Sequence, residues 1–290
     1  MVTEVIKERE SDILPNAIWV DEDRNTKYHV FRWSENPDPE TMYPLKVRAA
    51  NLDYCIFSPK KNIDIFVTAK EIEHHMGSVN HDSPSVNIPA GMVTFALLSG
   101  KDKGFVIQNV HRVKGKNILW TSLRCVVRSQ QKGGVGTDLI RVGLAEAEIA
   151  YGRIDYLSGR SQAEPVFLSH KKLEKDGITV RIRPLDMLYD EKTSAIMQAE
   201  KARALYGEID ADSSTGLQEG VYGRRRYQFD PPSSSDEPEK YENFMNIHNR
   251  LKELGMDWDK GHAIIYLVEF VQRPATLTFQ NLRRMASTIS

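Results

Sequence analysis

The residues with the clearest chemical potential lie in the glycine-rich segment Lys132–Thr137, which reads Lys-Gly-Gly-Val-Gly-Thr. A phosphate-binding loop of this kind needs a lysine directly before its Ser or Thr, on the first turn of a helix. Here Gly136 precedes Thr137, and the residues that follow are rich in strand formers. We therefore interpret the segment as a glycine-rich hairpin loop between two strands, and we expect no nucleotide or other cofactor.

Four side chains that could bind a metal are grouped in the first third of the chain, namely Glu71, His74, His75 and His81. Their spacing is not that of a His-Glu-x-x-His zinc motif. Adjacent histidines of a helix also point to different sides of it. The spacing favours a surface or capping role over a metal site, and whether the histidines bind metal stays open.

Acid–base and nucleophilic chemistry have weak candidates. Glu146 and Glu148 are two residues apart, so on a strand they would face the same side; an exposed face opposing Arg141 or Arg153 is the commoner arrangement. The sequence has no Gly-x-Ser-x-Gly elbow, and its two cysteines, Cys55 and Cys125, lie within apolar runs where Cys acts as a small hydrophobe. These observations predict a protein that is not an enzyme and has no catalytic residue.

Basic residues are concentrated in the middle of the chain. Residues 101–183 hold 16 Lys and Arg against 8 Asp and Glu, a net charge of +8, so the remainder carries −9 of the total of −1. Such asymmetry favours a polyanionic partner. A positive groove with aromatic stacking faces is typical of proteins that bind single-stranded nucleic acid. The candidate contacts are Lys114, Lys116, Arg124, Arg128, Lys132, Arg141, Arg224, Arg225 and Arg226, with Trp120, Tyr151 and Tyr156 as stacking faces. The alternatives are a solvated surface of mixed charge and aromatics that belong to the core.

Short strand-like segments separated by turns must position these residues. Close spacing of this kind predicts an antiparallel all-β fold rather than alternating βαβ units. The expected strands are 17–20, 27–33, 47–57, 62–68, 86–98, 105–113, 117–128, 139–154, 164–169 and 177–183, with a short helix at 69–76. We expect a mainly β protein, an antiparallel jelly-roll-like β-sandwich with flanking helices and a small α/β C-terminal tail module.

The pattern along the chain predicts four parts. Residues 1–16 form a mobile N-terminal segment, and 17–207 form the β-sandwich core, which ends in a helix over 190–206. The Ser-, Pro- and acid-rich stretch 208–240 reads as a flexible linker. The tail module, 241–290, is expected to hold a helix at 241–254, a strand at 263–271 and a last helix near 277–285. The sequence indicates neither a signal peptide nor a run of ~20 apolar residues, so we expect an intracellular protein whose membrane contact, if any, is peripheral.

The central block, about 47–160, resembles the thirty-kilodalton superfamily of plant-virus cell-to-cell movement proteins. Val86–Leu98 followed by Ser99–Gly104 is similar to the signature strand and its polar turn, with Asp102 as the signature Asp. The later strands of the family are similar to segments 116–120, 125–128 and 139–153. Its signature glycine corresponds to Gly134 or Gly136 in this resemblance. Asp102 lies farther from the strand than is usual in the family, and the glycine comes sooner. The resemblance implies a jelly-roll-like fold, cooperative binding of single-stranded RNA, self-association, and action at plasmodesmata with host plasmodesmal proteins.

A second interpretation remains open. A viral or phage structural protein, a coat or nucleocapsid-type β-sandwich that self-assembles through its terminal segments, would show the same strands and turns. Assembly distinguishes the two, because a shell protein forms particles whereas a movement protein binds RNA without closed shells.

Overall fold

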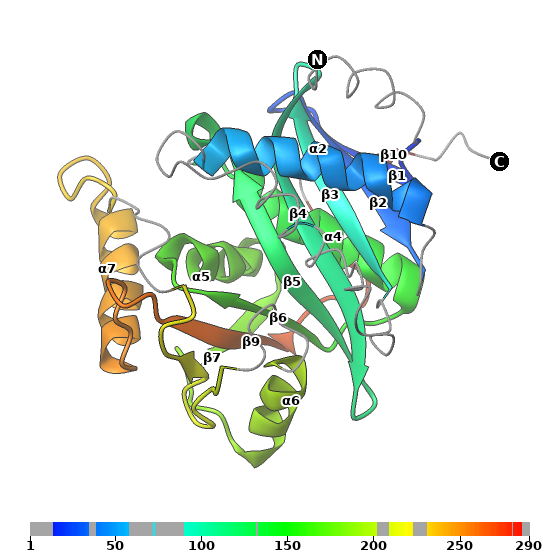
Figure 1. Cartoon of the computed structure of the whole chain (residues 1–290). Helices are drawn as coiled ribbons and strands as arrows, with labels where there is room; N and C mark the ends of the chain where they lie inside the picture. Colours follow the sequence, from blue (N-terminus) through cyan, green and yellow to red (C-terminus); the bar gives the residue numbers. More distant parts are fainter. Residues whose placement is uncertain are drawn as a thin grey trace. The chain divides into compact units, whose positions relative to one another are not determined.

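The computed structural model describes residues 14–34, 39–57, 72, 90–131, 133–201, 209–222, 231–279 and 281–285. The chain divides into two compact units. Unit 1 comprises Met1–His111, Thr121–Gly152 and Thr278–Ser290, and unit 2 comprises Arg112–Trp120 and Arg153–Leu277. Two long strands, β4 (Lys101–Val113) and β5 (Lys116–Val126), therefore have residues in both units. Figure 1 shows the elements coloured along the chain.

The strands of unit 1 follow one another in the order β10-β1-β2-β3-β4-β5. β1, β2, β3 and β10 pair antiparallel, so that Trp19 lies opposite Tyr28, Tyr28 opposite Ala96, and Ile18 opposite Met285. These four strands are β1 (Ala17–Asp21), β2 (Thr26–Trp33), β3 (Gly91–Leu98) and β10 (Arg283–Met285).

Two helices cover opposite faces of these strands (Figure 1). Helix α2 (Pro39–Phe57) buries Met42, Leu45 and Ala49 in one core cluster with Phe31, Phe95 and Phe105. Helix α4 (Val135–Tyr151) contacts the other face, because Tyr28, three residues from Phe31 on the same strand, donates a hydrogen bond to Asp138. Residues an odd number apart on a strand face opposite sides. A short 3-10 turn, η2 (Arg128–Gln130), precedes α4.

In unit 2 the strands lie in the order β6-β9-β7, and β8 also pairs with β9. Helix α6 packs on the face of β9 that carries Ile265 and Leu267, whereas α5 places Phe167 against Tyr266 on the opposite face. Helix α7 packs on α5. The elements are β6 (Tyr156–Ser161), α5 (Glu164–Lys171), η3 (Lys172–Asp176), β7 (Thr179–Arg183), α6 (Glu191–Lys201), β8 (Leu217–Gln218), α7 (Pro238–Glu253) and β9 (Ala263–Gln272).

The expected mainly β jelly-roll-like sandwich is wrong, because the fold is α/β, with helices packed on the strands. Three expected strands are helical: 47–57 lies in α2, 139–154 largely in α4, and 164–169 in α5. Helix α2 contains Pro44 in its second turn, where proline lacks the N–H for one intrahelical bond. Helix α5 has Pro165 in its first turn, which is a common way to begin a helix.

Other local predictions agree with the structure. The hairpin of β1 and β2 is confirmed, as are strands at β3, β4, β5, β7 and β9 and helices at α6 and α7. The helix expected near 277–285 is wrong, since Arg283–Met285 pairs as a strand with β1. The segments 1–13, 62–68 and 223–230 lie outside the described residues. The division into mobile segment, core, linker and tail module stays a prediction.

Gly143 on α4 allows a close approach to β4, and this yields a test of the packing. An ideal Cβ at this position would lie 1.7 Å from Oε1 of Gln108, whose side chain is fully buried. Gly143→Ala should therefore reduce the free energy of unfolding by about 1–3 kcal/mol, the usual cost of overpacking. Chemical denaturation measures this value.

The matched background is Gln108→Ala, which vacates the space that the new methyl group needs. In that background Gly143→Ala should become neutral or stabilising, since alanine is the better helix former by about 1 kcal/mol. An equal loss in both backgrounds would contradict the close packing of α4 on β4.

Candidate functional site

The start of α4 is a glycine-rich turn that no side chain caps. Gly134 is the N-cap, in the left-handed conformation with φ of 84°, and no side chain caps the helix there. The first backbone bonds run from the N–H groups of Thr137 and Asp138 to the carbonyl of Gly134. The N–H groups of Val135 and Gly136 precede these bonds, a position where a helix offers no carbonyl partner of its own. Such N–H groups bind anions, aided by the helix dipole.

Two guanidinium groups hold the carbonyls of this turn. Arg24, from the hairpin between β1 and β2, donates to Gly133 O at 2.6 Å, and Arg124 from β5 donates to Gly136 O at 3.0 Å. Because both arginines bond carbonyl oxygens, they fix the orientation of the turn and place positive charge beside it. A side chain at Gly134 would displace Arg24, since an ideal Cβ would lie 2.5 Å from its Nη1.

Asp138 connects this turn to the strands below. Its carboxylate is buried, accepts a hydrogen bond from Tyr28 Oη at 3.0 Å, and forms ion pairs with Arg24 at 2.5 Å and Arg141 at 2.8 Å. Arg24 also pairs with buried Asp21 at 2.6 Å. Burial, followed by the carboxylate of Asp138, raises the pKa of Tyr28 well above its usual value.

A second buried carboxylate, Glu146, anchors the middle of α4. It accepts hydrogen bonds from Trp19 Nε1 at 2.9 Å and Arg284 Nε at 2.6 Å, and lies 3.4 Å from Arg32. The arrangement with Glu148 on the same side of a strand is therefore wrong, because residues two apart on a helix face different sides. We interpret Glu146 as a structural residue.

In unit 2 a buried carboxylate pairs with a partly exposed imidazole. Glu164 of α5 is buried, and its Oε1 lies 2.8 Å from Nδ1 of His248 on α7. The His248 ring stacks on Trp258, with centroids 4.6 Å apart, and on Phe244 at 6.5 Å. A second histidine, His170, contacts the Tyr266 hydroxyl through Nε2 at 3.2 Å. These contacts join α7, α5 and β9.

The residues predicted to bind nucleic acid are dispersed. Arg124 and Arg141, with Gly134 and Gly136, meet at the start of α4, as described above. Lys114 is an exposed turn residue with φ of 50°, and Arg128 begins η2. Lys116 pairs with Asp155 at 3.1 Å, and Asp102 pairs with Arg48 at 2.6 Å. Lys132, Arg224, Arg225 and Arg226 lie outside the described residues, as do Glu71, His74, His75 and His81.

The aromatic residues that were predicted to stack on bases are engaged within the protein. Trp120 and Tyr156 are buried in the core cluster of unit 2, and the Tyr151 hydroxyl donates to Trp33 O. They therefore serve packing rather than stacking on bases. Within the described residues no group of three or more metal-ligating side chains occurs. Cys125 is buried, and its thiol donates a hydrogen bond to Asp53 Oδ1 at 3.0 Å.

Arg24, Asp138 and Tyr28 were missed by sequence reasoning. Tyr28 and Asp138 are 110 positions apart, so no local spacing connects them. A usable signal existed for the turn itself: Leu139–Ile154 is far longer than the usual strand of about 5–6 residues. A helix there would have placed the three glycines at its start.

No family model matches the chain, and no curated protein matches it. Solved structures that it resembles are acetyltransferases. An aminoglycoside acetyltransferase from an uncultured soil metagenomic sample, in complex with sisomicin, has a TM-score of 0.33 and 16% identity over 52% of this chain and 90% of its own. A GNAT-family acetyltransferase from Brucella melitensis, in complex with acetyl-CoA, has a TM-score of 0.32 and 15% identity over 52% of this chain and 82% of its own. At such TM-scores and identities the likeness establishes no activity for this chain.

The viral interpretation is wrong. A non-enzymatic movement protein of the thirty-kilodalton superfamily, with single-stranded RNA and plasmodesmal proteins as partners, implies a jelly-roll-like fold, whereas this fold is α/β and no family model supports that superfamily. The prediction that the chain is not an enzyme is corrected as well, since the solved structures that it resembles are acetyltransferases. Among them is a ribosomal-protein-alanine N-acetyltransferase with a TM-score of 0.32, at 15% identity over 51% of this chain and 89% of its own. No helix among the described residues is long and apolar enough to cross a membrane.

The turn at the start of α4 can be tested by comparing two left-handed glycines. Gly134→Ala and Gly100→Ala both place an alanine at positive φ, which costs about 1–2 kcal/mol. Nothing lies within 4 Å of an ideal Cβ at Gly100, whereas the one at Gly134 meets Arg24. We expect Gly134→Ala to cost about 1 kcal/mol more, because it displaces a charged hydrogen bond. Equal losses in urea denaturation would contradict the contact with Arg24.

The buried Tyr28 predicts a loss of stability in alkali. In the unfolded chain the phenol ionises near pH 10, while in the folded chain its pKa is raised. The unfolded state therefore releases its proton first, so the stabilisation is complete below about pH 10 and is lost as pH rises beyond it. Tyr28→Phe should reduce the slope of unfolding free energy against pH between about pH 10 and 11. Tyr189, whose pKa burial also raises, should maintain part of the slope. An unchanged slope would contradict this assignment.

Proposed function

We propose that the chain is an enzyme that binds the diphosphate of an acyl-coenzyme A at the start of α4 and uses this cofactor as an acyl donor. The main support for this binding site is the uncapped N-terminus of α4, whose glycine turn is held by Arg24 and Arg124. Uncapped N–H groups, the helix dipole and glycines that let a ligand approach the backbone are the features used to bind diphosphates.

The charges at the turn suit an anionic ligand. Asp138 lies in the first turn of α4, but Arg24 and Arg141 both pair with it, so its negative charge is compensated. Coenzyme A presents a diphosphate, which needs several donors at once. The N–H groups of Val135 and Gly136 would hold its oxygens, and Arg124 would supply the nearby positive charge.

Acetyl-CoA is the proposed acyl donor because of its chemical groups, and its binding can be tested directly. Acetyl-CoA is present in the Brucella acetyltransferase named above, and it combines the diphosphate that the turn suits with a thioester. In the proposed reaction the acyl carbonyl carbon bonds to an acceptor nucleophile, the thioester C–S bond breaks, and the thiol of coenzyme A leaves with the proton that the acceptor loses.

Gly136→Asp provides the test. Only Val126 Cγ2 lies near an ideal Cβ at Gly136, at an ordinary 3.7 Å, so a side chain fits. A carboxylate in the first turn of a helix is stabilising, and side chains there lean toward the N-terminus. The variant should keep its melting temperature while its affinity for acetyl-CoA falls about tenfold or more through charge repulsion, measured by isothermal titration.

The matched control is Gly136→Asn, which has nearly the same shape and no charge. It should lose less affinity than Gly136→Asp at equal stability. Titration with inorganic pyrophosphate separates the diphosphate from the rest of the cofactor, and release of free thiol from acetyl-CoA reports the reaction. Wild-type protein that binds neither compound, or a Gly136→Asp variant that binds acetyl-CoA normally, would overturn the proposal.

A further inference from the structure

The imidazole of His248 in unit 2 is held in a single orientation. Its Nδ1 lies 2.8 Å from Oε1 of Glu164, which stands at the start of α5. The ring stacks on Trp258, with centroids 4.6 Å apart and planes 8° from parallel, and Phe244 lies 6.5 Å away at 12°. A hydrogen bond at one edge and the stacked rings therefore fix both the plane and the rotation of the imidazole.

The opposite edge of the same ring is open to solvent. An ionised carboxylate can only accept a hydrogen bond, so Nδ1 carries the proton that His248 donates to Glu164. In the neutral ring Nε2 then has the free electron pair, and it forms no hydrogen bond with any residue that the structure describes. The His248 side chain is 29% exposed, whereas that of Glu164 is 3% exposed. Solvent therefore reaches the ring from the side of Nε2.

The packing of α7 on α5 does not require this pair. Helix α7 already buries the apolar side chains of Phe244, Ile247 and Leu251. His248 is the one described partner of the buried Glu164 carboxylate, and replacing a buried ion pair by apolar side chains of similar size is often neutral or stabilising. A buried carboxylate that orients an accessible imidazole is instead the arrangement used where the imidazole takes up a proton during a reaction.

We propose that His248 is a general base that activates water for the hydrolysis of small esters of phenols, with Glu164 as its positioning residue. The water gives one proton to Nε2 while its oxygen bonds to the carbonyl carbon of the ester. The bond from that carbon to the phenol oxygen then breaks, and the phenolate leaves with the proton that Nε2 has taken up. The products are a carboxylic acid and a phenol. Because a phenolate leaves readily, a positioned base is sufficient for esters of this class.

The probe is para-nitrophenyl acetate, added to the full chain and followed by the absorbance of the released nitrophenol. Wild-type protein should hydrolyse it faster than buffer does, and His248→Gln should lower kcat about 100-fold, the lower end of the contribution of a general base. Glu164→Gln should lower kcat about tenfold and leave KM unchanged, because it disturbs only the orientation of the base. Free imidazole should restore part of the rate of His248→Ala, since it supplies the missing base.

Two controls separate this chemistry from unspecific reactivity and from packing. His29, in unit 1, is the other partly exposed histidine among the described residues, and it has no hydrogen bond to a described carboxylate. His29→Gln should therefore keep the wild-type rate. The double variant Glu164→Leu with His248→Phe replaces the pair by apolar side chains and should be inactive, while its melting temperature stays equal or rises.

The activity lies in unit 2 and does not rest on the acyl-coenzyme A site proposed for α4. Gly136→Asp should accordingly hydrolyse the ester at the wild-type rate, and His248→Gln should keep its affinity for acetyl-CoA. Wild-type protein that is no faster than buffer, a His248→Gln variant as active as the wild type, or a double variant with a lowered melting temperature would each overturn the proposal.

Discussion

The carboxylate of Asp138 is the interaction on which the geometry of unit 1 depends. It is fully buried, and a buried charge is strongly destabilising unless hydrogen bonds and opposite charges compensate it. Tyr28 supplies a hydroxyl, and Arg24 and Arg141 supply guanidinium groups. The position of α4 on β2 is therefore set by a group that must find these partners. Since Arg24 also holds Gly133 O, the same contact fixes the glycine turn, and the anion site depends on the interior of the unit.

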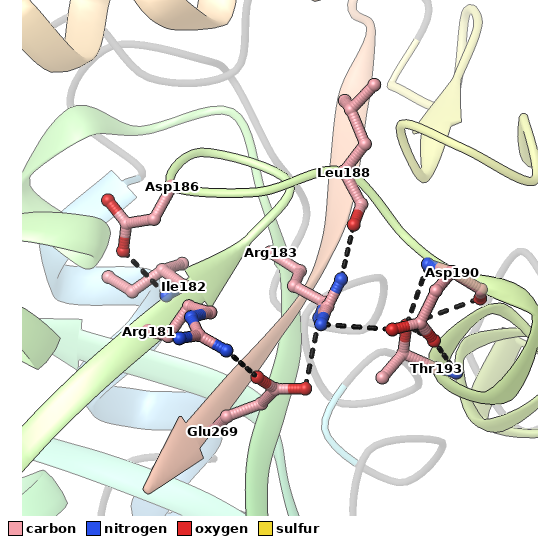
Figure 2. Close-up of polar contacts among 8 residues, drawn as sticks. All are labelled: Arg181, Ile182, Arg183, Asp186, Leu188, Asp190, Thr193 and Glu269. Atoms are coloured by element: carbon pink, nitrogen blue, oxygen red, sulfur yellow. Dashed lines mark hydrogen bonds and ion pairs between the residues drawn. The ribbon is translucent and has the colours of Figure 1, made fainter. Parts of the chain in front are cut away.

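Unit 2 uses a buried cation in the same way. Arg183 is bound by Glu269, Asp190 and Leu188 O, so a side chain, a helix start and a loop carbonyl all converge on it (Figure 2). Asp190 at the same time exchanges hydrogen bonds with Thr193 at the beginning of α6. A change at Glu269 would thus reach α6 through Arg183.

The parts of the fold that could be predicted from sequence are those fixed by local chemistry. The β1–β2 hairpin has a polar turn between two apolar runs, and α6 and α7 show helical spacing. Helix α4 was misread because its residues 145–148, Ala-Glu-Ala-Glu, alternate between apolar and polar, although Ala and Glu are strong helix formers. Its glycines were noticed, but a turn that begins a helix and a hairpin loop use the same residues. The partners of Asp138 could not be predicted, because the Tyr28 contact spans 110 positions and leaves no periodic pattern.

The excess of positive charge in residues 101–183 also has a structural explanation. A regional count assumes that charges are compensated by their neighbours in sequence, whereas these cations are compensated from elsewhere in the chain. Arg183 and Arg181 pair with Glu269, and Lys171 pairs with Asp186, both outside the block. Part of the +8 is therefore compensated by internal ion pairs, and a further cation, Arg124, is bound to a backbone carbonyl. The site proposed at the start of α4 depends on a different quantity, namely the backbone donors and the charge that remain there after internal pairing is complete.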